Sequence, residues 1–425
     1  MKKILTAFLL TLSASAMAQT VLFHTGDSTG YPYRIPAITT TAQGKVVALT
    51  DIRPCGGDIG YGRVDILGRT SLDGGATWGN VQNVLVGTGS GPETGYGDAC
   101  LVADSKREEL LLVCVSGDVP YWNSRVEKSQ RFVATWGKWN KKTQQWEWQK
   151  PVDQTAHVYK ELLGGRINGL FMGSGRICQS TKVKVGKYYR LYCAVLQTVA
   201  NGEWMNFVLF SDDFGESWSV LGGVNQAPIM KGADEAKVEE LPGGGLLISS
   251  RTNNNGRNFN IITFSDVKRG EGSWGEMAHS SKHNGGVFSD RNACNGELMV
   301  VPVKRRSDNK PMYLLLQSLP FGPHRTHVGI YYKSLESSAD VASPERIAEN
   351  WEGRFEITPR TSAYSTMALQ SDGSIGFLYE EDELYDRRGG GYSIIYDNFS
   401  VEQITEGKYS YNPKSSKKLW KSYEK

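Results

Sequence analysis

An eight-residue pattern occurs twice in this 425-residue chain, and it limits the folds that the chain can adopt. Residues 71–78 and 211–218 both follow the pattern Ser-x-Asp-x-Gly-x-Ser/Thr-Trp, each after one apolar run and before another. In such a segment the Asp side chain accepts hydrogen bonds from nearby N–H groups, and glycine adopts the positive φ of a tight turn. The tryptophan can pack between neighbouring sheets. Recurrence of this turn predicts a fold built from repeated hairpins.

Short apolar runs of strand length occur throughout the chain, separated by Gly, Asn and Asp, and prolonged helical periodicity is missing. Examples are residues 45–49, 110–114, 189–193 and 246–249. Runs of this length with flanking turn residues and β-branched or aromatic content predict strands. Many evenly spaced short strands favour a sandwich, barrel or propeller over an α/β fold, and the repeated octapeptide favours the propeller.

The first 18 residues have the pattern of a secretory signal peptide. Lys2 and Lys3 precede the apolar run 4–12, and Ala16-Met17-Ala18 resembles a cleavage site. The apolar run is far shorter than the ~20 residues that cross a bilayer, and no later segment comes close. We therefore expect an exported protein, periplasmic or secreted, with no membrane span. We also expect a monomer, with one domain over residues 19–425.

Charge and cysteine content narrow the range of partners. The formal net charge is +3, of which the two signal lysines supply +2, so a near-neutral chain gives no electrostatic case for nucleic acid. The six cysteines and six histidines show no metal-ligand spacing, and we expect no metal and no cofactor. Cys100 with Cys114, and Cys178 with Cys193, flank turn-like segments. Hairpin disulfides and buried free thiols both remain open for these pairs.

Residues 33–37, Tyr-Arg-Ile-Pro-Ala, resemble the Phe/Tyr-Arg-Ile-Pro motif that opens the catalytic domain of bacterial exo-α-sialidases, also called neuraminidases. Further matches follow in the order of that family, and they span essentially all of the chain after the signal peptide. They are the Arg–Asp segment 51–58, the two octapeptides, which resemble the Asp box, the Glu–Arg hairpin 234–251, and the Tyr–Glu segment 363–380. The resemblance implies an all-β fold, a six-bladed β-propeller of four-stranded antiparallel blades, in which the Asp box is structural.

The resemblance also implies roles for single residues. It gives Asp58 as the general acid/base, Tyr364 as the nucleophile and Glu235 as the carboxylate paired with that nucleophile. Three arginines would hold the carboxylate of sialic acid. The residues implied to bind substrate, or to orient the side chains that bind it, are Arg34, Arg53, Asp98, Arg251, Arg325 and Glu380. Among them, Glu380 would orient the first arginine, and Asp98 would lie near the N-acetyl group of the sugar.

Some of these assignments have rivals in the sequence itself. Asp51 and Asp65 are alternatives for the acid, since a carboxylate in a glycine-rich loop is often only a turn residue. We interpret Glu239 and Glu240, which follow the proposed base closely, as solvated strand residues. Arg325 is assigned as the third arginine because it lies just before a predicted strand. It is preferred over the pair at 305–306, which lies in a charged segment that we expect to be exposed.

The chemistry of the predicted substrate accounts for these residue types. Guanidinium is permanently charged and pairs with a carboxylate through two parallel hydrogen bonds, which lysine cannot do. Sialic acid carries a carboxylate on its anomeric carbon, so a carboxylate nucleophile would be repelled, and sialidases use tyrosine instead. The prediction is a retaining exo-α-sialidase that acts on sialylated glycans through a sialyl-tyrosine intermediate. A non-hydrolysing sialic-acid-binding propeller and a trans-sialidase are the alternatives, and the first has no need of Tyr364, Glu235 and Asp58.

Overall fold

The computed structural model describes residues 19–198, 202–223, 226–291, 294–382 and 391–413. The predicted signal peptide at 1–18 and residues 414–425 lie outside this range. Twenty-nine strands and three short α-helices make up the described part, which confirms the all-β prediction. None of the described helices is both long enough and apolar enough to cross a membrane.

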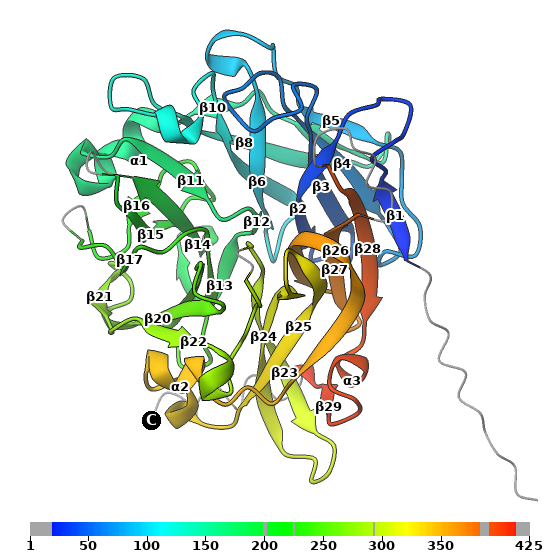
Figure 1. Ribbon diagram of the computed structural model, residues 1–425, viewed down its shortest axis with the longest axis vertical. Helices are drawn as coiled ribbons and strands as arrows, with labels where there is room; N and C mark the ends of the chain where they lie inside the picture. Colours follow the sequence, from blue (N-terminus) through cyan, green and yellow to red (C-terminus); the bar gives the residue numbers. More distant parts are fainter. Residues whose placement is uncertain (1–18, 199–201, 224–225, 292–293, 383–390, 414–425) are drawn as a thin grey trace, which may run out of the picture.

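The strands form five hydrogen-bonded sheets that are arranged around a common centre (Figure 1). The four-stranded sheet has the order β2 (Tyr33–Thr40), β3 (Val46–Ile52), β4 (Asp65–Ser71) and β5 (Gln82–Leu85). One six-stranded sheet has the order β10 (Val152–Asp153), β8 (Arg131–Asn140), β7 (Glu109–Ser116), β6 (Tyr96–Ala103) and β12 (Gly175–Arg176), with β9 (Gln145–Trp148) paired to β8.

The other three sheets complete the ring. The second six-stranded sheet has the order β11 (Gly169–Met172), β14 (Tyr188–Thr198), β15 (Trp204–Ser211) and β16 (Ser219–Val220), with β13 (Cys178–Val185) on β14 and β17 (Met230–Lys231) on β15. The five-stranded sheet has the order β18 (Ala236–Glu240), β19 (Leu246–Arg251), β20 (Arg257–Asp266) and β21 (Glu271–Trp274), with β22 (Ala278–Ser280) on β20. The eight-stranded sheet has the order β1 (Thr20–Phe23), β28 (Ser393–Phe399), β27 (Ile375–Glu381), β26 (Gly353–Leu369), β25 (Thr326–Leu335), β24 (Pro311–Gly322), β23 (Leu298–Arg305) and β29 (Tyr409–Tyr411).

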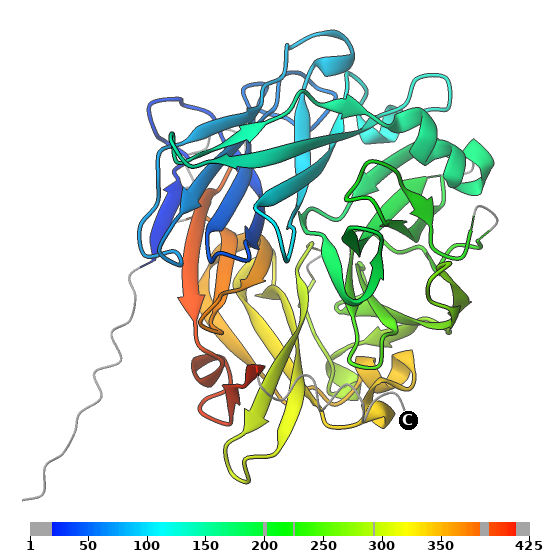
Figure 2. The ribbon, with the colours of Figure 1, turned by 180° about the vertical axis from the view of Figure 1, so that it is seen from behind.

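The helices lie at the periphery of the ring in both views (Figures 1 and 2). The α-helices are α1 (Thr155–Glu161), α2 (Pro344–Ala348) and α3 (Val401–Ile404). The 3₁₀ turns are η1 (Gly91–Glu93), η2 (Tyr121–Asn123), η3 (Leu163–Gly165), η4 (Lys282–Asn284) and η5 (Ser338–Val341). The centre of the ring is therefore lined by strands, with β2, β6, β12 and β26 nearest to it (Figure 1).

Strand pairing does not reproduce six blades of four strands, because the sheets contain eight, six, six, five and four strands. Part of the difference arises from the 17-residue strand β26. Its residues 353–361 pair with β25 and its residues 362–369 pair with β27, so one strand joins two groups that would otherwise be separate. Short extra strands at the edges account for the rest.

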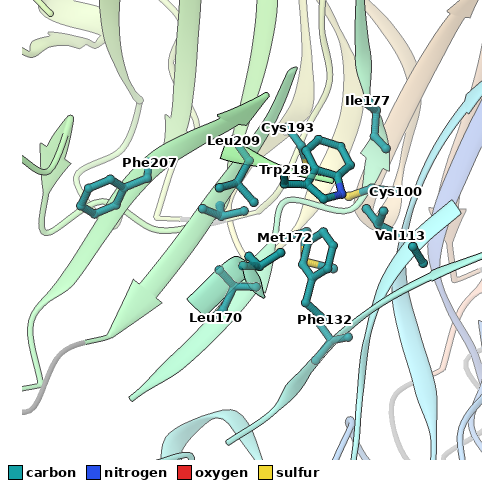
Figure 3. Packing of buried hydrophobic residues seen from close by; sticks show 14 of the residues in the cluster. Cys100, Val113, Phe132, Leu170, Met172, Ile177, Cys193, Phe207, Leu209 and Trp218 are labelled. Carbon is teal, nitrogen blue, oxygen red and sulfur yellow. The ribbon is translucent and has the colours of Figure 1, made fainter. Parts of the chain in front are cut away.

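The hydrophobic core lies mainly between neighbouring sheets. The largest group of buried side chains joins the two six-stranded sheets, with Phe132 and Cys100 on one side and Phe207 and Leu170 on the other (Figure 3). Trp218, the last residue of the second octapeptide, is 1% exposed in this group. Strands buried on both faces carry near-continuous apolar runs, and every residue of β3 is buried in this way.

The two octapeptides form almost identical turns. In the first, Gly75 N–H donates to Ser71 Oγ at 2.8 Å and Thr77 N–H donates to Asp73 Oδ1 at 2.8 Å. The corresponding distances in the second are 2.8 and 2.9 Å. The turns connect β4 to β5 and β15 to β16, so each closes a hairpin as the pattern predicts.

All six cysteines are free thiols, and five of them are buried. Cys100 lies opposite Val113 in its ladder, and Cys178 lies opposite Tyr192, so neither predicted pair faces across its hairpin. Of the two alternatives left open by the sequence, the structure has the buried free thiols.

Candidate active site

Three of the sequence-predicted site residues lie at irregularities in strand pairing. The register shifts just after Arg34 in β2, around Asp98 in β6 and around Tyr364 in β26. Such bulges bend a strand and re-aim its side chains, and they are common next to active sites. Ile35 and Asp98 have φ of 60° and 56°, a left-handed conformation that is strained for a β-branched residue such as isoleucine.

Tyr364, Glu235 and Arg251 form one hydrogen-bonded group. The Tyr364 hydroxyl donates to Glu235 Oε2 at 2.6 Å. Arg251 Nη1 donates to the same carboxylate oxygen at 2.7 Å and to the Tyr364 hydroxyl at 2.9 Å. Asp234 Oδ2 lies 3.2 Å from Arg251 Nε on the other side of the guanidinium. The arrangement holds a phenol, a proton acceptor and a cation in mutual contact.

Burial sets the protonation of this group. Removal from water raises the pKa of Tyr364 well above its usual value, and the negative charge of Glu235 adds to the rise. Burial also raises the pKa of Glu235, although Arg251 and the Tyr364 hydroxyl both oppose the rise. The site therefore keeps the proton on the phenol, next to the carboxylate that can accept it.

Glu380 in β27 holds two parts of the site together. It is fully buried, and its Oε1 accepts hydrogen bonds from Arg34 Nε at 2.8 Å and from the backbone N–H of Ile35 at 2.7 Å. Its Oε2 accepts from the backbone N–H of Tyr364 at 2.9 Å. Burial opposes the charge on Arg34, but Glu380 outweighs it, so the pKa of Arg34 rises further. The carboxylate thus fixes both the arginine and the strand of the tyrosine.

The three predicted arginines gather around Tyr364. The guanidinium carbons of Arg34 and Arg325 lie 5.6 and 5.9 Å from the centre of its ring, and Arg251 bonds its hydroxyl. Arg325 follows β24 in a turn and has φ of 62°. Three permanently charged guanidinium groups around one tyrosine make a site for an anionic ligand, with a carboxylate as the best geometric match.

A second cluster consists of Asp51, Arg53, Asp58 and Asp98. Arg53 Nη2 lies 3.2 Å from Asp51 Oδ2 and 3.1 Å from Asp58 Oδ1. The side chain of Asp58 is 53% exposed, whereas Asp51 and Asp98 are buried. Burial is the main reason that the pKa of Asp51 is raised to about 7 and that of Asp98 well above its usual value. Asp98 Oδ2 is buried and has no hydrogen-bond partner among the described residues.

The alternative residues considered for the acid and for the third arginine differ from the predicted ones in location or in burial. Asp65 is bound by Arg63 and by the N–H of Gly87, and it serves the loop rather than the cluster. Asp51 belongs to the cluster, but it is fully buried, unlike Asp58. Arg305 pairs with Asp308 and Glu336, outside the group around Tyr364.

The interpretation of Glu239 and Glu240 as solvated is wrong, because both side chains are buried. Glu239 pairs with Arg176, and Glu240 accepts hydrogen bonds from Ser180 and Thr181. Buried carboxylates are tolerated when partners of this kind satisfy them, and the partners come from a different part of the chain. Tyr392 was not predicted from the sequence as a site residue. The centre of its ring lies 5.3 Å from the guanidinium carbon of Arg34.

No group of three or more His, Cys, Asp or Glu side chains positioned to hold a metal ion occurs among the residues that the structure describes.

The fold and the site together define a class: an all-β protein of packed sheets around a centre, with a buried tyrosine–glutamate pair surrounded by arginines. No family model matches the chain. It is 25% identical to a sialidase of Micromonospora viridifaciens over 393 residues, 88% of this chain and 52% of that protein. It is 23% identical to a sialidase of Bacteroides fragilis over 379 residues, 84% of this chain and 61% of that protein.

The similarity extends to solved structures. The intramolecular trans-sialidase of Ruminococcus gnavus, solved with oseltamivir carboxylate, has a TM-score of 0.71 at 15% identity, over 92% of this chain and 99% of that chain. At that identity the likeness concerns the fold alone. Together with the sequence relatives, it shows that the chain is similar to bacterial sialidases in sequence and in fold. The chain spans 52% and 61% of the length of the two sequence relatives.

Proposed function

We propose that this protein is an exo-α-sialidase, a glycoside hydrolase that removes terminal α-linked sialic acids from glycoproteins, glycolipids and oligosaccharides. The observation that carries the proposal is the 2.6 Å hydrogen bond from Tyr364 to Glu235 within a group of three arginines. Arginines alone suffice to bind a carboxylate. A phenol bonded to a buried carboxylate adds a nucleophile with its base, which a binding protein does not need.

Substrate binding in this proposal begins with the carboxylate of sialic acid, which Arg34, Arg251 and Arg325 receive. Glu380 orients the first of these guanidinium groups before substrate arrives, which lowers the cost of ordering it on binding. In the same proposal, Arg53 contacts the sugar ring and Asp98 lies near the N-acetyl group.

The proposed reaction has two steps and retains the anomeric configuration. In the first, Tyr364 Oη bonds to the anomeric carbon while Glu235 accepts the phenolic proton, and Asp58 donates a proton to the leaving oxygen. In the second, Asp58 accepts a proton from water as the water oxygen attacks the anomeric carbon, and Glu235 returns its proton to the departing Tyr364. The half-exposed side chain of Asp58 suits an acid that meets both a leaving group and water.

We also propose that the architecture is a six-bladed propeller. Dividing the eight-stranded sheet within β26 leaves six strand groups in place of five sheets. The inner strands of neighbouring groups then converge on the site. Export through the predicted signal peptide and a monomeric state complete the proposal. N-terminal sequencing of the mature protein, with Gln19 as the expected first residue, and light scattering after size exclusion test these two points.

The test is a proton NMR time course with 3′- and 6′-sialyllactose. We expect the α-anomer of free sialic acid to appear first and then to mutarotate. Tyr364→Phe should lower kcat by a factor of about 10³ or more, as expected for loss of a nucleophile. Tyr159→Phe is the control, since that buried hydroxyl donates to the Gln130 carbonyl and does not bond Tyr364 or Glu235, and it should keep kcat. A folded wild-type protein that releases no sialic acid from either substrate would refute the proposal.

A trans-sialidase is the second candidate, because the intramolecular trans-sialidase matches this fold over 99% of its own chain. The same NMR experiment separates the two. An internal transfer gives an anhydro sugar without mutarotation, and transfer to an added acceptor gives a new sialoside. Hydrolysis gives free sialic acid alone.

A further inference from the structure

Two members of a second polar group, which the proposed mechanism does not use, lie two residues after Glu235 and Tyr364 in the sequence. Successive side chains of a strand alternate between its faces, so residues two apart share a face. Lys237 in β18 comes two residues after Glu235, which directly precedes that strand, and Thr366 in β26 comes two residues after Tyr364. Glu297, just before β23, lies between them. We call Lys237, Glu297 and Thr366 the central cluster.

The central cluster connects the two strands through one carboxylate. Thr366 Oγ1 donates to Glu297 Oε2 at 2.9 Å, and Lys237 Nζ lies 3.5 Å from the same oxygen. All three side chains are at most 2% exposed. A buried ion pair of this kind is stable only with further hydrogen bonds, and both partners have them.

Those further hydrogen bonds come from residues 173–176. Lys237 Nζ donates to the carbonyls of Gly173 and Ser174 at 3.1 Å each and to that of Arg176 at 2.9 Å. The N–H of Arg176 donates to Glu297 Oε2 at 3.0 Å. This segment contains β12, near the centre of the ring (Figure 1). At Gly175 (φ 115°) an added Cβ would lie 3.0–3.1 Å from all three members of the central cluster.

No backbone ladder within the described strands sets the distance between Glu235 and Tyr364. β18 is at the end of the five-stranded sheet, and β26 lies inside the eight-stranded sheet. The separation of the two strands therefore depends on side chains that bridge the sheets. We infer that Lys237, Glu297 and Thr366 are positioning residues that hold Glu235 within hydrogen-bond distance of Tyr364, an inference that rests on the proposed function.

The test uses Thr366→Val, which keeps the side-chain shape and replaces the hydroxyl with a methyl group. We expect kcat to fall about tenfold with KM within about twofold, because a small displacement of reacting groups lowers the rate far more than binding. The acidic limb of the kcat/KM profile should also move to higher pH, since the Tyr364 hydrogen bond lowers the pKa of Glu235. Glu297→Gln should have the same effects, and larger ones.

The matched control is Thr135→Val in β8, another fully buried threonine, whose hydroxyl donates to the Gln149 carbonyl at 2.8 Å. Both valine variants should lower Tm by similar amounts, but only Thr366→Val should change kcat and the pH profile. A Thr366→Val protein with a lower Tm and wild-type kcat and pH profile would overturn the inference, because the cluster would then be only structural.

A crystal structure of Thr366→Val tests positioning without activity. A Tyr364 Oη–Glu235 Oε2 distance beyond about 3.2 Å, outside hydrogen bonding, supports the inference, and an unchanged distance of 2.6 Å overturns it. If the wild-type protein cleaves no sialoside, the proposed function fails by itself, and this distance still decides the positioning role.

Discussion

Replacing Glu380 with glutamine should damage both stability and activity, although it changes only one oxygen to an amide nitrogen. Glu380 accepts three hydrogen bonds, two on Oε1 and one on Oε2. Glutamine offers one oxygen, so in either orientation its NH₂ group faces an N–H donor. At least one buried N–H is then unsatisfied, which costs about 1–3 kcal/mol.

The same substitution removes the charge that compensates Arg34, whose side chain is 17% exposed. Breaking a buried ion pair costs about 3–5 kcal/mol, so the total loss is about 4–8 kcal/mol. With an unfolding entropy of about 2.1 cal/mol/K per residue over a domain of about 400 residues, Tm should fall by about 5–10 °C. Differential scanning fluorimetry measures this shift.

Activity should fall independently of stability, because the Arg34 guanidinium and the Tyr364 backbone lose their common support. We expect kcat/KM for sialyllactose to fall about 100-fold when it is assayed well below the Tm of the variant. Glu240→Gln is the control: this buried carboxylate accepts from Ser180 and Thr181, and its loss should lower Tm without changing kcat. A Glu380→Gln protein within about 2 °C of the wild-type Tm and with normal kcat/KM would refute the reasoning.

Three other perturbations have definite expected outcomes. Asp58→Ala should slow cleavage of sialyllactose far more than that of an aryl sialoside, whose leaving group needs little protonation; equal losses would exclude Asp58 as the acid. The pKa of Asp51 is about 7 in the folded protein and ordinary in the unfolded chain, so its protonation stabilises the fold most below about pH 4, and this stabilisation is lost as pH rises through 7. Asp51→Asn should therefore gain stability relative to wild type between pH 4 and 8 in thermal melts, and a constant difference would contradict the assignment. Asp213→Asn, which disturbs the second octapeptide turn, should lower Tm by about 1–4 °C and leave kcat unchanged, and a loss of kcat would show that the turn affects the site.

Local patterns in the sequence predicted the strands and the two hairpin turns well. The octapeptide carries its own hydrogen-bond partners, since Ser71, Asp73 and Thr77 bond one another within one turn. Such local structure depends little on the rest of the chain. The number of strands per sheet depends instead on pairing between distant segments, and no local pattern indicated that β26 would pair along both halves.

The same distinction holds for the site. The order of motifs along the chain indicated which residues to expect, including Tyr364 and Glu235, which are 129 positions apart and directly bonded. It did not indicate burial. Glutamate is usually a surface residue, but the fold places Arg176 beside Glu239, and a carboxylate with such a partner can be buried. A charge is therefore assigned to surface or interior only once its partner is known.

The location of buried charge also bears on how such a site keeps its geometry. Four of the five sheets contribute to it, through Arg34, Asp98, Arg251 and Tyr364, and hydrogen-bonded ladders fix positions only within a sheet. Distances between sheets are set by packing and by side-chain bonds, and apolar packing is not directional. Hydrogen bonds and ion pairs are directional, so a register of a few tenths of an ångström between sheets calls for polar groups at the centre. This accounts for a centre that contains Lys237, Glu297 and Glu380, all with hydrogen-bond or ion-pair partners. An apolar core of equal volume would hold the sheets together, but it would leave the tyrosine and its base free to separate.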